Sequence, residues 1–182
     1  MNLANQLTLA RIILVPLFMV FLLVKTTYGQ LMAAVVFIVA AATDILDGYI
    51  ARSRKQISNL GKIIDPLADK LLISAALISL VELNLVKAWV AFIIISREFA
   101  VTGLRTVAAA EGHVIAASPL GKLKTISQIV AVVATLIQNL PIPYLPILAK
   151  ILLYFAVFIT IYSGIDYFLK NKDLLNIDKE GL

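Results

Sequence analysis

Residues 44–69 read DILDGYIARSRKQISNLGKIIDPLAD. This stretch holds four of the chain's 11 acidic residues, and apolar sequence flanks it on both sides. The four form two pairs, three and four positions apart, and each spacing places both carboxylates on one face of a helix. The pairs are Asp44 with Asp47 and Asp65 with Asp69. Because carboxylates beside membrane-like sequence are costly without a partner, the stretch predicts a site for a cationic ligand.

The composition is that of an integral membrane protein. Of the 182 residues, 61% are hydrophobic and 15% are charged, and the mean hydropathy is +0.96. Soluble domains average about 45–50% apolar and about 25% charged residues. The chain has no cysteine and one histidine, which excludes disulfides, thiolate metal sites and a multi-histidine zinc centre within one chain. Its net charge of +5 suits anionic headgroups or phosphorylated substrates, and the dispersed basic residues argue against nucleic-acid binding.

Six apolar segments of roughly 20 residues each nearly exhaust the chain. We expect transmembrane helices at about 7–24, 30–50, 61–83, 87–110, 122–140 and 147–169. The expected fold is therefore an all-α integral membrane protein with one transmembrane domain over residues 1–182. The first segment could instead be a signal peptide, but no small-residue cleavage site follows it, which favours a retained span.

Basic residues gather on one side of the expected membrane. They occur between the second and third segments, around the connection between the fourth and fifth, and after the sixth. The other side carries only Lys25, Lys87 and Lys150. Because cytoplasmic loops are enriched in lysine and arginine, we expect both termini and the aspartates to face the cytoplasm.

The aspartates and the residues between them suit phosphate chemistry. Four carboxylates at two helix ends can surround a pair of hard cations, and all-oxygen ligation favours Mg²⁺ or Mn²⁺. Such metals polarise phosphoryl oxygens and neutralise charge on attacking and leaving groups. Arg52 offers a bidentate phosphate clamp, Gly48 leaves room for a nucleotide, and Gly61 keeps the entrance near Asp65 clear. Solvated acids paired with nearby basic residues are the alternative, which the spacing of all four disfavours.

Eight positions of this stretch match the pattern D-x2-D-G-x2-A-R-x8-G-x3-D-x3-D. The matching residues are Asp44, Asp47, Gly48, Ala51, Arg52, Gly61, Asp65 and Asp69. Because every fixed position is satisfied, the chain resembles the CDP-alcohol phosphatidyltransferases. The expected six spans fit that family too, so the resemblance extends over nearly the whole chain.

The resemblance implies attack of an acceptor hydroxyl on the β-phosphorus of CDP-diacylglycerol, with release of CMP. It implies two divalent cations held by Asp44, Asp47, Asp65 and Asp69. Asp69 would also act as general base toward the acceptor hydroxyl. Asp47, Gly48 and Arg52 would hold the CDP group. The family further suggests a homodimer in a bacterial cell membrane.

The N-terminal sequence NQLTLAR resembles the family's opening pattern N-x-L-T-x-x-R. Asn5, Thr8 and Arg11 could line the nucleotide pocket. Equally, Asn5 or Thr8 could cap a helix and Arg11 could anchor lipid headgroups. We include Asn5 and Thr8, with Gly61, among the expected contacts of the CDP-linked lipid.

A second group of basic residues lies in REFAVTGLR (97–105) and GKLKT (121–125). Arginine inside a span is costly unless it faces a polar cavity or an anion, so these residues suggest a second phosphate site. The same segments resemble those of bacterial family members whose acceptor is sn-glycerol 3-phosphate. The expected phosphate ligands are Arg105, Lys122, Lys124 and Arg97. Arg97 could instead form an internal ion pair, and the lysines could simply mark a cytoplasmic loop.

Other functions remain as alternatives. Inositol phosphate is the strongest rival acceptor because it also carries phosphate, and inositol or serine would follow the same chemistry. A small cation transporter is the rival from another class. Transporter ion sites usually lie at the bilayer midplane between related halves, whereas this chain has its acids near one face and no visible repeat.

Three expectations concern local structure. The segment 111–123 contains Gly112, Ser118, Pro119 and Gly121 and is expected to be a loop. Gln128 and Gln138 are expected to hydrogen-bond between helices. Asp166 and Lys170 have the i,i+4 spacing of a helical ion pair.

Overall fold

The computed structural model describes residues 3–24, 26–54, 59–110, 112, 115 and 118–172, and within these ranges not the side chains of 3–7, 44–54, 59–67 and 69. The described residues form six α-helices and no strand, which confirms the all-α prediction for this part of the chain. The helices are α1 (Leu3–Leu23), α2 (Thr27–Arg54), α3 (Asn59–Glu82), α4 (Ala88–Ala110), α5 (Pro119–Ile137) and α6 (Leu145–Lys170).

Each helix corresponds to one predicted apolar segment, but the predicted loop at 111–123 was too long. Helix α5 already begins at Pro119, which occupies the first turn, where its missing N–H has no helical partner to lose. Ser118 is the N-cap, and its Oγ accepts a hydrogen bond from the Gly121 amide at 3.0 Å. Ser118, Pro119 and Gly121 thus marked the start of a helix, whereas Gly112 lies in a turn after α4 as expected.

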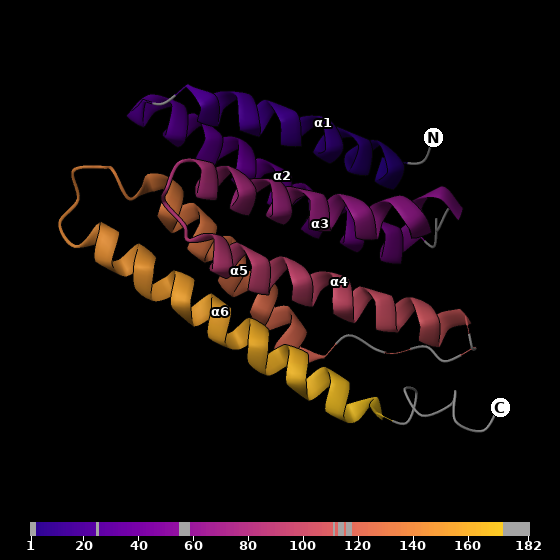
Figure 1. Cartoon of the computed structure of the whole chain (residues 1–182). Coiled ribbons are helices and arrows are strands. Elements are labelled where there is room, and N and C mark those ends of the chain that lie inside the picture. Colours follow the sequence, from indigo (N-terminus) through magenta and orange to yellow (C-terminus); the bar gives the residue numbers. More distant parts are fainter. Residues whose placement is uncertain are drawn as a thin grey trace.

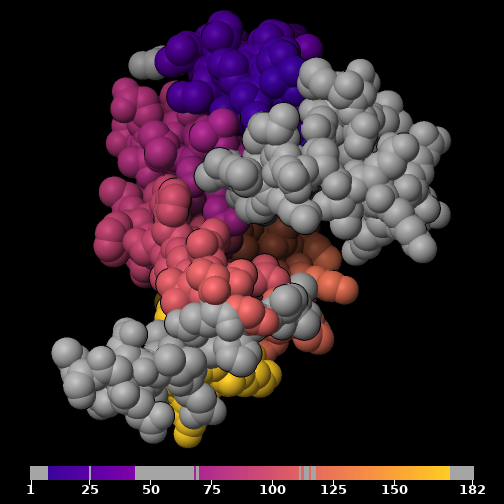
Figure 2. Space-filling model, turned by 90° about the vertical axis from the view of Figure 1, so that its right-hand side faces the viewer, coloured from indigo at the N-terminus to yellow at the C-terminus, as the bar shows by residue number. Residues whose placement is uncertain are grey.

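Successive helices run in opposite directions along one bundle (Figure 1). The start of α1 and the end of α6 lie at the same end of the bundle, together with the end of α2 and the start of α3 (right in Figure 1). Helix α1 packs mainly on α2 and α3, whereas α6 packs on α5 and α4. Figure 2 views this end of the molecule, with α1 and α6 at opposite edges and α4 between them.

The core of the bundle combines large side chains with many alanines. Phe18 of α1 and Phe37 of α2 are fully buried, with ring centroids 5.8 Å apart. Small residues allow neighbouring backbones to approach closely, as is common between membrane helices. The most buried alanines of this core are Ala33, Ala34, Ala40, Ala76, Ala131 and Ala156.

The outer surface is also apolar. Large side chains such as Ile13, Phe92, Phe158 and Ile165 are exposed on several helices, an arrangement that is unusual for a soluble monomer. Helices α5 and α6 are long and apolar enough to cross a membrane by length and composition, and Thr8–Leu23 and Thr27–Thr43 are shorter apolar helical stretches. These features are consistent with a membrane protein.

Two predicted polar contacts are confirmed. Gln128 of α5 donates a hydrogen bond from Nε2 to Oγ1 of Thr160 in α6 at 3.0 Å, and both residues are buried. Lys170 Nζ lies 2.9 Å from the carboxylate of Asp166 within α6. The first contact ties α5 to α6 close to the site described next.

Candidate active site

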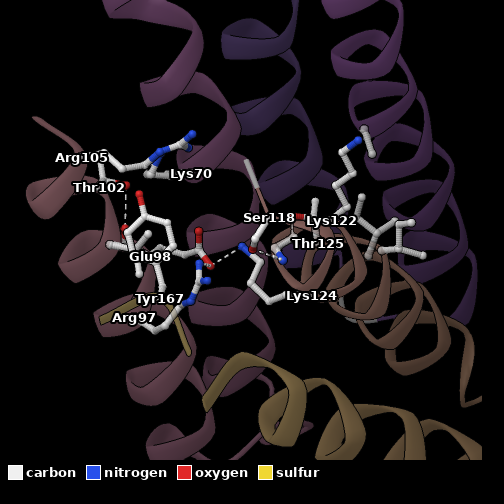
Figure 3. A pocket seen from close by; sticks show the side chains of 15 residues that line it. Lys70, Arg97, Glu98, Thr102, Arg105, Ser118, Lys122, Lys124, Thr125 and Tyr167 are labelled. Atoms are coloured by element: carbon white, nitrogen blue, oxygen red, sulfur yellow. Dashed lines mark hydrogen bonds and ion pairs between the residues drawn. The ribbon is translucent and has the colours of Figure 1, made fainter. Parts of the chain in front are cut away.

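A cavity of about 460 Å³ lies near the end of the bundle where α4 ends and α5 begins (Figure 3). All four basic residues expected to bind the acceptor's phosphate line it, although they come from two different helices. Residues from α2, α3 and α6 complete the wall. The polar lining residues are Lys70, Arg97, Glu98, Thr102, Arg105, Ser118, Lys122, Lys124, Thr125 and Tyr167.

Helical periodicity explains why these residues share a cavity. On α4, Arg97, Val101 and Arg105 recur every four residues and therefore lie on one face. On α5, Gly121 and Thr125 follow the same rule. Packing of both helices against α6 turns the two polar faces toward one space.

Glu98 organises the wall between α4 and α5. Its Oε1 accepts a hydrogen bond from the ammonium of Lys124 and lies 3.6 Å from Nη1 of Arg97. Arg97 also donates from Nη2 to Oγ of Ser163 in α6 at 2.7 Å. Lys124 is only 5% exposed. A buried charge is tolerated only when it is paired and hydrogen-bonded, so these contacts hold three helices in register.

Arg105 and Lys122 have different surroundings. Both are exposed, and neither forms an ion pair with a carboxylate among the described residues. Nη2 of Arg105 donates to the backbone carbonyl of Ile115 at 3.1 Å, and the guanidinium also interacts with the hydroxyl of Tyr167, which leaves its remaining N–H groups for a ligand. These two cations are therefore better placed to bind an anion than Arg97 and Lys124.

Sequence reasoning missed part of this cavity. Lys70 lines it from α3 and Tyr167 from α6, and Glu98 had no predicted role. Lys70 carried a signal, because it directly follows Asp69 at the border of an apolar run. Tyr167 carried none, since an aromatic residue near a helix end is usually read as an interfacial anchor.

The N-terminal candidates lie in α1. Thr8 is 1% exposed and Arg11 is 0% exposed, so both are inside the bundle. Full burial argues against Arg11 as a headgroup anchor, because a snorkelling arginine keeps its guanidinium at the surface. The side chain of Asn5 lies outside the described residues.

The motif residues lie on two consecutive helices. Asp44 and Asp47 are in the C-terminal part of α2, and Asp65 and Asp69 are in the N-terminal half of α3, so both pairs are near the same end of the bundle. Their side chains, that of Arg52, and the surroundings of the motif glycines Gly48 and Gly61 lie outside what the structure describes. Elsewhere in the described part of the chain no group of three or more acidic or histidine side chains could hold a metal ion.

The cavity adjoins these motif segments. Ala41 precedes Asp44 by three residues, Lys70 follows Asp69 directly, and both Ala41 and Lys70 line the cavity. The basic residues of α4 and α5 thus face the helix ends that carry the aspartates. An all-carboxylate donor set there fits hard divalent cations such as Mg²⁺ or Mn²⁺.

Comparison with known proteins gives a consistent result. The family model for CDP-alcohol phosphatidyltransferase matches residues 1–162. The CDP-diacylglycerol–glycerol-3-phosphate 3-phosphatidyltransferase of Bacillus subtilis is 49% identical over 187 residues, covering 96% of this chain and 97% of the relative. Proteins of the same name are 37% identical in Rickettsia typhi (92% and 95% covered) and 38% identical in Haemophilus influenzae (91% and 91%). The chain therefore belongs to the CDP-alcohol phosphatidyltransferase family.

Proposed function

We propose that this protein transfers the phosphatidyl group of CDP-diacylglycerol to sn-glycerol 3-phosphate, giving phosphatidylglycerophosphate and CMP. The observation that carries the proposal is the cavity in which Arg105 and Lys122 face the helix segments that bear the family's aspartates. An acceptor that already carries phosphate needs such a second cationic site, whereas serine or inositol does not. The names of the relatives support the same acceptor.

Two divalent cations, Mg²⁺ or Mn²⁺, would be held by the four aspartates. When bound, they polarise the phosphoryl oxygens and neutralise the charge that develops on the attacking and leaving oxygens. The ligands would be Asp44, Asp47, Asp65 and Asp69.

The other steps fall to side chains of the protein. Asp69 accepts the proton of the acceptor's primary hydroxyl as that oxygen attacks the β-phosphorus. Asp47, Gly48 and Arg52 hold the CDP group, and Gly61, Asn5 and Thr8 complete the contacts with the CDP-linked lipid. Release of CMP then leaves the phosphatidyl group on the acceptor.

The acceptor's phosphate is bound chiefly by Arg105 and Lys122. Both reach the cavity without a carboxylate partner among the described residues. Arg97 and Lys124, which contact Glu98, contribute mainly by shaping the wall and by their long-range positive charge.

The six helices would all span a cell membrane, with both termini and the active site in the cytoplasm. At 1.5 Å per residue, helices of 19 to 28 residues measure about 28–42 Å, which fits a hydrocarbon core of about 30 Å. The distribution of lysine and arginine supports this orientation. We further propose a single domain over residues 1–182 and a homodimeric bacterial enzyme.

The test is release of CMP by the purified full-length protein. It would be supplied with CDP-diacylglycerol, Mg²⁺ or Mn²⁺, and one acceptor at a time: sn-glycerol 3-phosphate, inositol phosphate, inositol or serine. We expect metal-dependent CMP release with glycerol 3-phosphate. Release with another acceptor alone would overturn the acceptor assignment, and no release with any acceptor would overturn the enzyme assignment.

A further inference from the structure

Glu98 is the only carboxylate among the described residues that line the cavity. Its Oε1 is engaged by Lys124 and Arg97. Oε2 accepts no hydrogen bond from the described residues, and the side chain is 12% exposed. Figure 3 shows this oxygen pointing away from Lys124, toward the part of the cavity where Arg105 and Lys70 are labelled. One oxygen of Glu98 is therefore anchored and the other faces the cavity.

A polyol that enters this cavity needs an acceptor for its hydroxyl proton. The lysine and arginine side chains can only donate hydrogen bonds. Thr102 and Thr125 donate their hydroxyl protons to backbone carbonyls, at 2.6 Å and 3.2 Å, so their oxygens can accept a hydrogen bond only as neutral groups. A carboxylate oxygen is the stronger acceptor, because a hydrogen bond to an ionised group is roughly twice as strong as a neutral one. Oε2 of Glu98 is the best-suited acceptor on the described wall.

Charge also dictates which end of the ligand approaches Glu98. A phosphate dianion is repelled by the carboxylate and attracted to Arg105 and Lys122, while an alcohol group carries no charge and can approach. The contacts of Lys124 and Arg97 with Oε1 fix the orientation of the carboxylate. A phosphorylated polyol would therefore bind with its phosphate near Arg105 and a hydroxyl near Glu98.

We propose that Glu98 is a specificity-determining residue that accepts a hydrogen bond from the acceptor's non-attacking hydroxyl. For sn-glycerol 3-phosphate this is the secondary hydroxyl on C2, and the primary hydroxyl remains free to attack. The inference rests on the proposed function. Such a contact would let the site distinguish a phosphorylated triol from a phosphorylated diol. When an analogue without the C2 hydroxyl binds, the carboxylate oxygen of Glu98 is left without a hydrogen-bond donor, and this loss weakens binding of the analogue.

The test compares two acceptors in the full-length protein in lipid nanodiscs. The first is sn-glycerol 3-phosphate, and the second is 3-hydroxypropyl phosphate, which keeps the phosphate and the primary hydroxyl but lacks the C2 hydroxyl. We expect wild-type kcat/KM to favour glycerol 3-phosphate by on the order of ten- to a hundredfold, the range of one hydrogen bond to a charged group. Glu98→Gln should reduce this preference by about tenfold, because it lowers kcat/KM for glycerol 3-phosphate and leaves kcat/KM for 3-hydroxypropyl phosphate nearly unchanged.

Two variants serve as controls. Glu82→Gln makes the same chemical change at an exposed acid at the C-terminus of α3, the end of that helix away from the motif aspartates. Ser163→Ala removes the hydrogen bond that supports Arg97 and so disturbs the wall without touching the acceptor. Both should retain the wild-type preference even if total activity changes.

The ratio of kcat/KM values for the two acceptors shows whether Glu98 recognises the hydroxyl or only supports the wall of the cavity. If Glu98→Gln lowered kcat/KM for both acceptors by the same factor, Glu98 would not recognise the hydroxyl. A wild-type protein that used both acceptors equally well would also overturn the inference. Should Glu98→Gln fail to fold, Glu98→Asp retains the charge but withdraws the carboxylate by one methylene, and it should likewise reduce the preference. Failure of the proposed function is a separate result, since the wild-type protein would then release no CMP with glycerol 3-phosphate.

Discussion

Nη2 of Arg97 in α4 lies 2.7 Å from Oγ of Ser163 in α6. The same guanidinium lies 3.6 Å from the carboxylate of Glu98, and that carboxylate also forms an ion pair with Lys124 of α5. One chain of polar contacts therefore crosses three helices. The hydrogen bond between Gln128 and Thr160 joins α5 and α6 on the same side. Because lipid tails are as apolar as the helix surfaces, such interhelical hydrogen bonds specify how membrane helices pack. The wall of the cavity is thus also what holds α4, α5 and α6 together.

Replacing Arg97 with Met should mainly reduce stability. The change leaves Ser163 without its donor and Glu98 with Lys124 alone, and we expect a loss of about 1–3 kcal/mol. Thermal unfolding in detergent would measure this loss, and the KM for glycerol 3-phosphate should rise far less than when Arg105 is replaced, because Arg97 contributes only long-range charge. Ser163→Ala should give a smaller decrease of the same kind. A large rise in KM without loss of stability would instead identify Arg97 as a phosphate ligand.

Replacing Arg105 with Ala should weaken acceptor binding. Loss of a guanidinium that faces the bound phosphate should raise the KM for glycerol 3-phosphate by about ten- to a hundredfold, and that for CDP-diacylglycerol much less. Arg105→Lys should recover part of the loss, since lysine retains the charge but not the bidentate geometry. Lys87→Ala, at an exposed cation near the start of α4, serves as the control. A selective effect on CDP-diacylglycerol would assign Arg105 to the lipid's phosphate.

Two lysines on α5 should respond differently to the same change. Lys122→Gln removes an exposed cation, so it should raise the KM for glycerol 3-phosphate severalfold with little change in Tm. Lys124→Gln removes the ammonium that neutralises Glu98 inside the wall, so it should lower the Tm clearly. Steady-state kinetics and thermal unfolding of both variants would check this. Equal effects of the two changes on both quantities would contradict the distinction between them.

Activity should depend on divalent metal and on Asp69. Chelation of divalent cations should abolish CMP release, and either Mg²⁺ or Mn²⁺ should restore it. Asp69→Asn should abolish turnover while weakening the binding of CDP-diacylglycerol far less, because it removes the base but leaves three carboxylates for the metals. Direct binding of a labelled CDP-lipid, measured beside turnover, tests both statements. Equal loss of binding and turnover would count against Asp69 as a base.

Two glycines should differ in their tolerance of a methyl group. A Cβ on Gly29 would overlap the carbonyl oxygen of Val24 and lie 2.7 Å from that of Phe21, at the connection between α1 and α2. Gly29→Ala should therefore destabilise the protein by about 1–3 kcal/mol. Nothing lies within 4 Å of a Cβ on Gly103, so Gly103→Ala in α4 should stabilise it by about 0.5–1 kcal/mol. Thermal unfolding of both variants would measure the contrast, and similar Tm values would contradict it.

The sequence by itself determined the helical framework. Apolar runs of membrane length predicted every helix to within a few residues, because the cost of unsatisfied backbone groups in lipid leaves helices as the simple solution. Spacings of three and four residues also predicted the ion pair between Asp166 and Lys170, since both residues lie on one helix. The start of α5 was missed because Ser118 and Pro119 are found both in loops and at helix N-termini.

Only the tertiary structure decided how the basic residues are divided. Periodicity shows which face of a helix a residue occupies, but not which residue of another helix it meets. Lys122 and Lys124 are two positions apart on α5, yet Lys124 is buried against Glu98 and Lys122 is exposed at the cavity. That difference arises from the rotation of α5 against α4 and α6, which depends on the packing of the whole bundle. The same packing anchors one oxygen of Glu98 and turns the other toward the cavity.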